Sequence, residues 1–500
     1  MNFFIKLENP RNLLNISCFI PLKFGNSKIM NDNAVEKIEK LLKKHNQTHL
    51  LGFYEQLNAE QKNNLLAQIG DLDFPKIDDW VTNLVKNPVS NTIRSDFSPA
   101  PYYHCEPIDS DNRQKYAEAK ELGKKLISNG KVAAFVVAGG QGTRLGFEGP
   151  KGNFPISPVK NKTLFQIFAE SIAAVSQKYN AACPWYIMTS SLNHDETKEI
   201  FRSNDYYGLE EKNVFIFQQQ TLPNFSFDGK ILLAEKDTIA CSPDGHGGSL
   251  KALYKSGAVE DMKKRGIDFI SYFQVDNPLI NIFDPLFIGL HAIDKAQMSS
   301  KTLVKTRPKE KVGNFCLLNG KITVIEYSDL PDKLAEKQNH DGSLFFSLGS
   351  IAIHIINRSF VEKLNHKGFS LPIHRAVKKI SHIDNQGKTI EQNGVKLESF
   401  VFDALPLADK SIILQTRRSQ EFAPVKNAAG ADSIETAKEM MLARSADWLE
   451  SARIIVPKKE DGSIDCLIEI APAFALEKQD IKEKITRIPQ IKPGDKLYLD

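Results

Sequence analysis

The sequence predicts an α/β protein built on a mostly parallel sheet, and three observations lead to this fold class. Short apolar runs, typical of buried strands, alternate with stretches of helical periodicity between residues 116 and 405. Apolar residues before this region recur mostly at helical spacing, and the apolar runs after it are short and interrupted by prolines. With 500 residues the chain is also too long for one average core, so more than one domain is expected.

We expect four segments along the chain. Residues 1–29 lack the charged, apolar and cleavage regions of a signal peptide. They are either a loosely held arm or the result of a misassigned start codon, and the sequence leaves both open. Residues 30–115 are expected to form a helical N-terminal region, residues 116–405 the main α/β domain, and residues 406–500 a small, partly β C-terminal domain.

Local patterns predict the individual elements. Val132–Val137 is an unbroken apolar run and predicts a buried strand, and Thr163 can cap a helix that begins just after it. Asn319-Gly320 stands between two apolar runs and predicts a tight hairpin. Further strands are expected at residues 185–189, 213–217, 268–275, 302–306, 412–414 and 454–456, and further helices at 195–203, 285–296 and 433–443.

Composition argues against several classes of protein. The chain has 65 basic and 61 acidic residues, a net charge of +4, which is too balanced to suggest a nucleic-acid-binding surface. No apolar stretch has the length of a membrane span. The six cysteines are scattered and form no CxxC pair, which favours free thiols in a reducing compartment. We therefore expect a cytoplasmic protein that binds neither nucleic acid nor membranes.

The most informative motif directly follows the strand Val132–Val137. Residues 138–152 read AGGQGTRLGFEGPKG, so several glycines stand beside Arg144 and Lys151. Glycine lets backbone N–H groups approach a ligand closely, and such N–H groups with nearby Arg and Lys form a cradle for phosphate oxygens. The pattern is neither a P-loop, which needs Gly-Lys-Ser/Thr, nor the GxGxxG of a dinucleotide-binding loop. A glycine turn that only joins a strand to a helix would not explain the two cations, so we predict a triphosphate-binding loop.

Three further motifs carry polar groups at the ends of predicted elements. Gln219 follows the strand at residues 213–217, and a side-chain amide offers a donor and an acceptor that suit a pyrimidine edge. The sequence PDGHGG at residues 243–248 opens a helix, where backbone N–H groups bind polar or anionic groups. Asp276 ends a buried strand, which is where open α/β sheets bind ligands, and Mg²⁺ is commonly held by one or two carboxylates plus substrate phosphates.

Together these motifs resemble those of the eukaryotic-type UDP-sugar pyrophosphorylases, and their spelling is closest to the UDP-N-acetylglucosamine pyrophosphorylases. Matching motifs occur in the family's order from about residue 45 to about residue 430. The resemblance implies a Rossmann-like nucleotidyltransferase core with a mixed, mostly parallel sheet. It also implies that UTP and a sugar-1-phosphate are converted to a UDP-sugar and pyrophosphate, with Mg²⁺ as cofactor, by a monomer.

The same resemblance implies the roles of individual residues. The expected nucleotide contacts are Ala138, Gly139, Gly140, Gln219, Gly245 and Asp276, of which Asp276 also lies at the metal. The expected catalytic charges are Arg144, Lys151 and Lys426, and the expected additional phosphate contact is Lys396. The expected sugar contacts are His246, Gly313, Glu326, Ser350 and Phe400.

Two positions depart from the family pattern, and both fall where the sugar is expected. His246 stands in place of an asparagine and resembles the UDP-glucose and broad-specificity UDP-sugar pyrophosphorylases; Ser350 also replaces an asparagine. We predict N-acetylglucosamine-1-phosphate as the sugar substrate, with glucose- or galactose-1-phosphate as the alternative. The alternative of another class is a non-catalytic UDP-sugar-binding protein, which would not need Arg144, Lys151 and Asp276.

Overall fold

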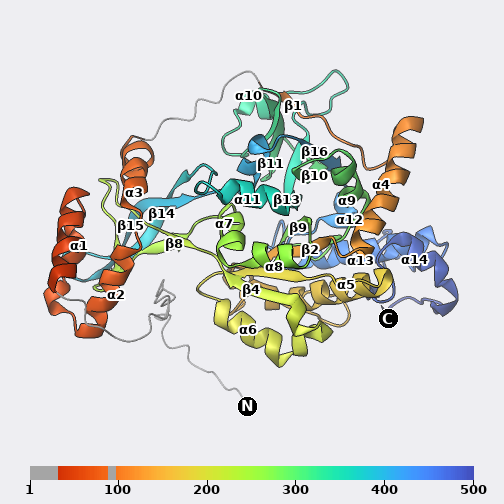
Figure 1. Ribbon diagram of the computed structural model, residues 1–500. Coiled ribbons are helices and arrows are strands. Elements are labelled where there is room, and N and C mark those ends of the chain that lie inside the picture. The colour runs from red at the N-terminus through yellow and green to blue at the C-terminus, as the bar shows by residue number, and fades with distance from the viewer. Residues whose placement is uncertain (1–31, 88–96) are drawn as a thin grey trace, which may run out of the picture. The chain divides into compact units, whose positions relative to one another are not determined.

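The structure, a computed structural model, describes residues 32–87 and 97–500 (Figure 1). Its contacts divide the chain into two units, each formed from three stretches of sequence. Unit 1 comprises Met1–Val89, Thr221–Pro243 and His374–Leu397. Unit 2 comprises Ser90–Gln220, Asp244–Ile373 and Glu398–Asp500. The expected arm at residues 1–29 lies outside the described residues.

Unit 1 joins the N-terminal helices to strands from two later segments. Its helices are α1 (Asp32–Lys44), α2 (Ala59–Gly70) and α3 (Phe74–Trp80), with short helical turns at Thr48–Leu51, Tyr54–Gln56 and Val81–Lys86. Its strands pair two by two: β5 (Thr221–Pro223) with β8 (Cys241–Pro243), β6 (Leu233–Glu235) with β7 (Thr238–Ile239), and β14 (His374–Ile383) with β15 (Thr389–Glu398).

Two buried glutamine side chains explain why residues 221–243 belong to unit 1 rather than to the expected α/β domain. The amide of Gln47 donates to Gly229 O (2.9 Å) and accepts from Ile231 N (3.0 Å). The amide of Gln68 on α2 likewise donates to Asp237 O (2.9 Å) and accepts from Ile239 N (2.8 Å). Each amide therefore binds the backbone as a neighbouring strand would, a long-range pairing that hydrophobic periodicity does not reveal.

Unit 2 is built on a mixed sheet. Its strands are β1 (Ser98–Pro99), β2 (Val132–Val137), β3 (Trp185–Thr189), β4 (Val214–Gln218), β9 (Phe269–Gln274), β10 (Met298–Val304), β11 (Gly313–Leu318), β12 (Lys321–Ile325), β13 (Leu348–Asn357) and β16 (Ser411–Gln415). Within the described residues these ten strands have the order β1-β11-β13-β9-β2-β3-β4, with β12 beside β11 and β10 between β13 and β16. The run β9-β2-β3-β4 is parallel, and β13 joins it antiparallel to β9. The expected mixed sheet is therefore confirmed.

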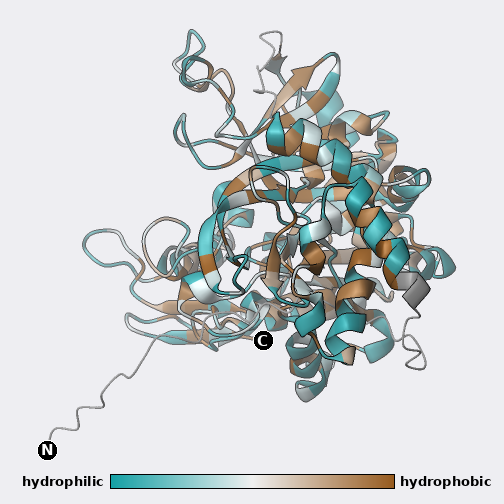
Figure 2. Ribbon diagram, turned by 90° about the vertical axis from the view of Figure 1, so that its left-hand side faces the viewer, coloured by the Kyte–Doolittle hydropathy of each residue, from teal (hydrophilic) through white to brown (hydrophobic). Residues whose placement is uncertain are grey.

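Helices cover this sheet, and fewer than half of the helices of unit 2 were expected from the sequence. The helices are α4 (Ser110–Ser128), α5 (Leu164–Tyr179), α6 (His194–Ser203), α7 (Gly248–Lys255), α8 (Ala258–Lys264), α9 (Pro285–Ile293), α10 (Asp332–Ala335), α11 (Arg358–Asn365), α12 (Arg418–Glu421), α13 (Ile434–Ser451) and α14 (Lys478–Glu483). Figure 2 shows hydrophilic and hydrophobic residues along the same helices, as expected for helices with one face on a core. Within the described residues, none of these helices has both the length and the apolar character needed to cross a membrane.

The fully buried strand β2 shows how the cores lie on the two faces of the sheet. Val132, Ala134 and Val136 join one apolar cluster, which includes residues of α4, α5 and α9. The alternate residues, Phe135 among them, join a second cluster with residues of α7, α8 and α11. Because strand side chains alternate between faces, a continuous apolar run is what a strand covered on both sides requires.

Local predictions hold where a short-range interaction fixes them. Thr163 caps α5 by accepting from Gln166 N (3.2 Å). Asn319 (φ 50°) and Gly320 (φ 74°) both adopt the left-handed region between β11 and β12, as a two-residue hairpin requires. The strand predicted at residues 454–456 is wrong, because α13 continues to Ser451 and these residues then form no strand; Ile455 is 85% exposed.

The C-terminal part of the chain is partly β, but its contacts place it in unit 2 and not in a unit of its own. Strand β17 (Leu467–Ile470) pairs in parallel with β18 (Lys496–Leu499), and both pack with α13 and α14 around a separate apolar cluster. The carboxylate of Glu469 accepts from the backbone N–H groups of Val159 (2.9 Å) and Lys160 (2.8 Å). These bonds tie the C-terminal part to the chain that follows the predicted phosphate loop, which explains why it belongs to unit 2.

Candidate functional site

The predicted phosphate loop leaves the carboxyl end of β2 and folds back on itself. Gly142 N donates to Gly149 O (3.0 Å), and Lys151 N donates to Gly140 O (3.0 Å). The buried side chain of Asn193 donates to Ala138 O (3.0 Å) and Gly140 O (3.3 Å). These carbonyl oxygens are therefore taken by donors of the protein and do not oppose an anionic ligand.

Unlike these carbonyl oxygens, two N–H groups at the start of the loop have no hydrogen-bond partner among the described residues. Ala138 N donates to Met188 O (2.8 Å), but the N–H groups of Gly139 and Gly140 have no acceptor among residues 32–87 and 97–500. A Cβ atom at Gly139 would lie 3.3 Å from both Gln219 Oε1 and Ser190 N, so a side chain there would crowd the loop. Two adjacent N–H groups without acceptors are what a phosphate-binding loop presents.

Four of the predicted charged residues, Lys151, Arg144, Lys426 and Asp276, lie near one another, with Lys151 as their common neighbour. Lys151 is only 8% exposed, and its ammonium interacts electrostatically with Asp276, Arg144 and Lys426. Burial lowers the pKa of Lys151, the carboxylate of Asp276 raises it, and the cations Arg144 and Lys426 lower it further. Positive charge exceeds negative charge at this point, which suits a polyphosphate.

Backbone contacts hold these charged residues beside β9 and β2. Val425 N donates to Asp276 O (2.8 Å), and Ala428 N donates to Arg144 O (3.1 Å). Asn277 is buried, donates to Glu421 O (2.8 Å) and accepts from Ala423 N (3.0 Å). The segment that carries Lys426 is thus fixed onto the end of β9, although about 150 residues separate the two in sequence.

The donor set around Asp276 fits a magnesium ion that is shared with a substrate. Within the described parts of the chain, no group of three or more His, Cys, Asp or Glu side chains could hold a metal ion. Mg²⁺ keeps several water or phosphate ligands and commonly takes only one or two carboxylates from the protein. Asp276 is half-buried and lies at the phosphate loop, so it can supply such a carboxylate.

The residues predicted to contact the base also come together. Gln219 follows β4, and its backbone N–H donates to Thr189 O (2.7 Å). Its side-chain Nε2 donates to Asp244 Oδ1 (2.9 Å) and to Gly245 O (2.7 Å). Gly245 has φ +82°, and a Cβ atom there would lie 2.3 Å from Ser399 O, so only glycine fits.

His246 lies against aromatic side chains from the segment after β15. Its ring centroid is 5.3 Å from that of Phe400 and 5.7 Å from that of Phe402. Its Nδ1 accepts from Val401 N (3.1 Å), so the neutral ring carries its proton on Nε2. This hydrogen bond and the two aromatic contacts hold the ring of His246 in place, and its contact with the sugar stays a prediction.

The remaining predicted sugar contacts form a group at β11 and β13 in unit 2. Gly313 on β11 pairs with Ser350 on β13. A Cβ atom at Gly313 would lie 3.3 Å from Glu326 Oε1 and 3.8 Å from Ser350 Cβ. Lys396 lies on β15 in unit 1, and its phosphate contact stays a prediction.

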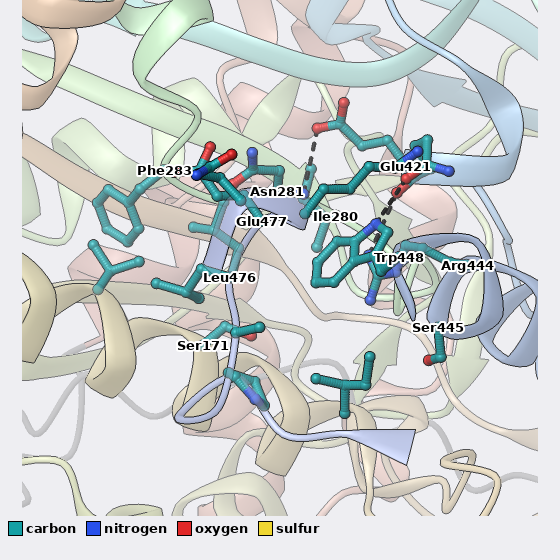
Figure 3. A pocket seen from close by; sticks show the side chains of 18 of the residues that line it. Ser171, Ile280, Asn281, Phe283, Glu421, Arg444, Ser445, Trp448, Leu476 and Glu477 are labelled. Carbon is teal, nitrogen blue, oxygen red and sulfur yellow. Dashed lines mark hydrogen bonds between the residues drawn. The ribbon is translucent and has the colours of Figure 1, made fainter. Parts of the chain in front are cut away.

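A cavity of about 490 Å³ lies elsewhere in unit 2, and none of the predicted site residues lines it. Figure 3 shows Glu421, Arg444 and Trp448 together on one side of this cavity. Glu421 accepts from Asn281 N (3.3 Å) and from the buried ammonium of Lys301 (2.5 Å). Glu421 therefore holds the start of the segment that carries Lys426 in place. The predicted chemistry lies at the phosphate loop and not in this cavity.

Sequence reasoning missed the buried polar residues that hold the site. Asn193, Asn277 and Glu421 each stand beside other polar residues in the sequence, and no local pattern marks them as buried. Asp244 is different, because it belongs to the PDGHGG motif, but the motif alone did not show that its side chain binds Gln219.

Comparisons with known proteins agree with this geometry. Residues 98–500 match the model of a family described as UTP–glucose-1-phosphate uridylyltransferase. The human UDP-N-acetylhexosamine pyrophosphorylase-like protein 1 is 34% identical over 424 residues, which are 81% of this chain and 84% of that protein. The probable UDP-N-acetylglucosamine pyrophosphorylase of Dictyostelium discoideum is 33% identical over 461 residues, 87% of this chain and 92% of that protein.

A solved structure extends the likeness to the fold. The uridine diphosphate N-acetylglucosamine pyrophosphorylase of Trypanosoma brucei, in complex with an inhibitor, matches with a TM-score of 0.79 and 26% identity. The match covers 95% of this chain and 99% of that one. The resemblance seen in the sequence is therefore confirmed, and the chain belongs to the UTP–glucose-1-phosphate uridylyltransferase family.

Proposed function

We propose that this protein is a UTP:sugar-1-phosphate uridylyltransferase that uses N-acetylglucosamine-1-phosphate and releases pyrophosphate. The single observation that carries the proposal is that Arg144, Lys426 and Asp276 all lie close enough to the buried Lys151 to interact with its charge. These charges lie beside a loop in which the N–H groups of Gly139 and Gly140 have no acceptor within the part of the chain that the structure describes. The names of the human and Dictyostelium relatives support the choice of an N-acetylated sugar.

In the proposed reaction, an oxygen of the sugar-1-phosphate attacks the α-phosphorus of UTP. One P–O bond forms, the bond to the β-phosphate oxygen breaks, and pyrophosphate leaves with the electron pair. The attacking oxygen is already anionic, so the reaction needs no general base, and positioning and charge neutralisation dominate catalysis. This fits a site in which Nδ1 of His246 is already bound to the backbone.

The charged residues divide this work between the two substrates. Arg144 and Lys151 neutralise the departing β- and γ-phosphates, with the N–H groups of the loop around them. Lys426 holds the phosphate of the sugar near the α-phosphorus. Mg²⁺, held by Asp276, would neutralise further charge on the phosphate oxygens when it is bound.

The second candidate function keeps the reaction but uses glucose- or galactose-1-phosphate. His246 and Ser350 support it, because both differ from the asparagines of the N-acetylglucosamine enzymes. The alternative of a non-catalytic UDP-sugar-binding protein would not need Arg144, Lys151 and Asp276, which lie together in the structure. A cytoplasmic location and a monomeric state also stay predictions, which imaging of a tagged chain and light scattering can test.

One assay separates these functions. Pyrophosphate release is measured from UTP, Mg²⁺ and each of three sugar-1-phosphates: N-acetylglucosamine, glucose and galactose. We expect N-acetylglucosamine-1-phosphate to give the highest kcat/KM, and Arg144→Ala to lower it with every sugar. Faster turnover of glucose- or galactose-1-phosphate would replace the substrate in the proposal. If UTP binds but no sugar-1-phosphate releases pyrophosphate, the protein is a binding protein.

A further inference from the structure

Hydrogen bonds within the protein fix the orientation of the Gln219 side-chain amide. Its two N–H donors point to two acceptors of the protein, Asp244 Oδ1 at 2.9 Å and Gly245 O at 2.7 Å. An amide has only two N–H groups, so both are used. Oε1 is therefore the end that remains for a base, and it lies next to Gly139, where an added Cβ atom would be 3.3 Å away.

An outward-facing acceptor discriminates between the two pyrimidines. Uracil has a donor at N3–H, which can bind an amide oxygen directly. Cytosine has an acceptor at N3, so the same oxygen would face another lone pair and lose the bond. A buried polar group left without a partner is costly, and sites built on such bonds reject analogues that lack the donor.

Of the two groups that fix the amide, Asp244 is the one whose chemistry can be changed by mutation. Its carboxylate is 3% exposed and lies against the start of α7, where a Cβ atom at Gly248 would come within 2.0 Å of Oδ1. An ionised carboxylate only accepts hydrogen bonds, so it permits one orientation of the Gln219 amide and opposes the reverse one. A carbonyl oxygen alone, that of Gly245, would hold one N–H group but leave the other free.

The buried environment of Asp244 disfavours the ionised form of its carboxyl group. Burial raises the pKa of Asp244 to about 6, although the hydrogen bond from Gln219 and the charge of Lys251 lower it. The folded protein therefore carries a destabilised carboxylate at neutral pH. Perturbed groups of this kind cluster at functional sites, and here the acidic group contacts a predicted base-binding residue.

We propose that Asp244 is a positioning residue that sets the preference for uracil over cytosine by fixing the side-chain amide of Gln219 with its oxygen toward the base. The inference rests on the proposed function for the place of the nucleotide, but it goes beyond it by assigning base specificity to a residue that need not touch the base. The inference predicts that the site binds any pyrimidine with an N3–H donor, so thymine should be accepted in place of uracil.

Equilibrium binding tests the proposal without turnover. The Kd values of UTP and CTP, with Mg²⁺ and no sugar phosphate, are measured by calorimetry for the wild type, Asp244→Ala and Asp244→Asn. We expect the CTP/UTP Kd ratio to fall about tenfold in Asp244→Ala, the effect of one hydrogen bond of about 1.4 kcal/mol. Asp244→Asn, which keeps an acceptor but adds a donor, should lower the ratio less.

Two further variants separate positioning from loosening of the loop. Ser399→Ala is the matched control, because Ser399 Oγ binds the main-chain oxygen of Asp244 (3.0 Å) and not its carboxylate. It should keep the wild-type ratio. In a Gln219→Leu background the amide is absent, so adding Asp244→Ala should change the ratio no further, whereas a general structural defect would lower the affinity for both nucleotides again.

The outcomes distinguish this inference from the proposed function. A wild type that binds UTP and CTP equally, or an Asp244→Ala variant that binds UTP with an unchanged ratio, overturns the inference. An equal fall in ratio for Ser399→Ala overturns it as well. Uracil-selective binding that depends on Asp244, without pyrophosphate release from any sugar-1-phosphate, would overturn the proposed reaction and leave the inference standing.

Discussion

Replacing Lys151 with methionine should have opposite effects on catalysis and on stability. The ammonium of Lys151 is 8% exposed and lies among Arg144, Lys426 and Asp276, so its charge is poorly screened by water. Loss of one fixed charge at a site of this kind removes about 3–4 kcal/mol of transition-state stabilisation, so Lys151→Met should lower kcat by about 10²–10³.

The free energy of unfolding should change in the other direction. Burial and the two neighbouring cations lower the pKa of Lys151, which means that the folded protein without substrate disfavours the charged side chain. Methionine has a similar length and no charge, so Lys151→Met should unfold at a higher urea concentration than the wild type near pH 7. The attraction of Asp276 for Lys151 opposes this gain but does not exceed the effect of burial.

Lys162→Met is the matched control, because Lys162 is also 8% exposed but is paired outside the site. Its ammonium binds Glu170 (2.5 Å) and Tyr498 Oη (2.6 Å). This substitution should lower the free energy of unfolding by about 1–3 kcal/mol and change kcat only slightly. Steady-state pyrophosphate release and urea denaturation measure both variants. A Lys151→Met variant with near-wild-type kcat, or equal effects of the two substitutions, would refute the assigned role.

Three other predictions follow from single positions. Gly245→Ala should lose about 1–3 kcal/mol of stability, and bind UTP weakly, because of φ +82° and the 2.3 Å contact with Ser399 O; unchanged denaturation and calorimetry would contradict this. The pKa of Asp244, raised from 3.8 to about 6, means that its protonated form favours folding, so the wild type should gain stability relative to Asp244→Asn as the pH falls from 7 to 4. If urea denaturation shows the same difference in unfolding free energy between the wild type and Asp244→Asn from pH 7 to pH 4, the raised pKa of Asp244 is contradicted. Glu421→Gln removes one of the two carboxylates that bind the buried ammonium of Lys301 and leaves Asp284 (2.7 Å), so it should lower the free energy of unfolding by about 1–3 kcal/mol. An unchanged melting temperature in scanning calorimetry would contradict this.

Much of the fold could be predicted because short-range chemistry fixes it. The apolar run of β2, the cap at Thr163 and the Asn319-Gly320 hairpin are all specified by neighbouring residues. The strand wrongly predicted at residues 454–456 shows the limit of such reasoning. An apolar triplet becomes a strand only when a partner strand is available, and here α13 extends through the region just before it instead.

The site divides in the same way. Arg144, Lys151, Gln219 and Asp276 could be named from the sequence, because each lies in a motif at the end of a predicted strand. The residues that fix their geometry could not: Asn193 holds the phosphate loop through carbonyl oxygens more than 50 positions away in sequence. Such contacts depend on which strands become neighbours, and no local pattern encodes that.

The sequence by itself determined the family, the phosphate loop and the residues that carry charge, since each of these depends on residue types at short spacing. Only the tertiary structure decided that residues 221–243 join the N-terminal helices, and that Asp244 uses up a donor of Gln219. The physical reason is that a buried hydrogen bond has direction as well as partners. Which end of an amide faces a ligand is settled by the groups packed around it, and these come from distant parts of the chain.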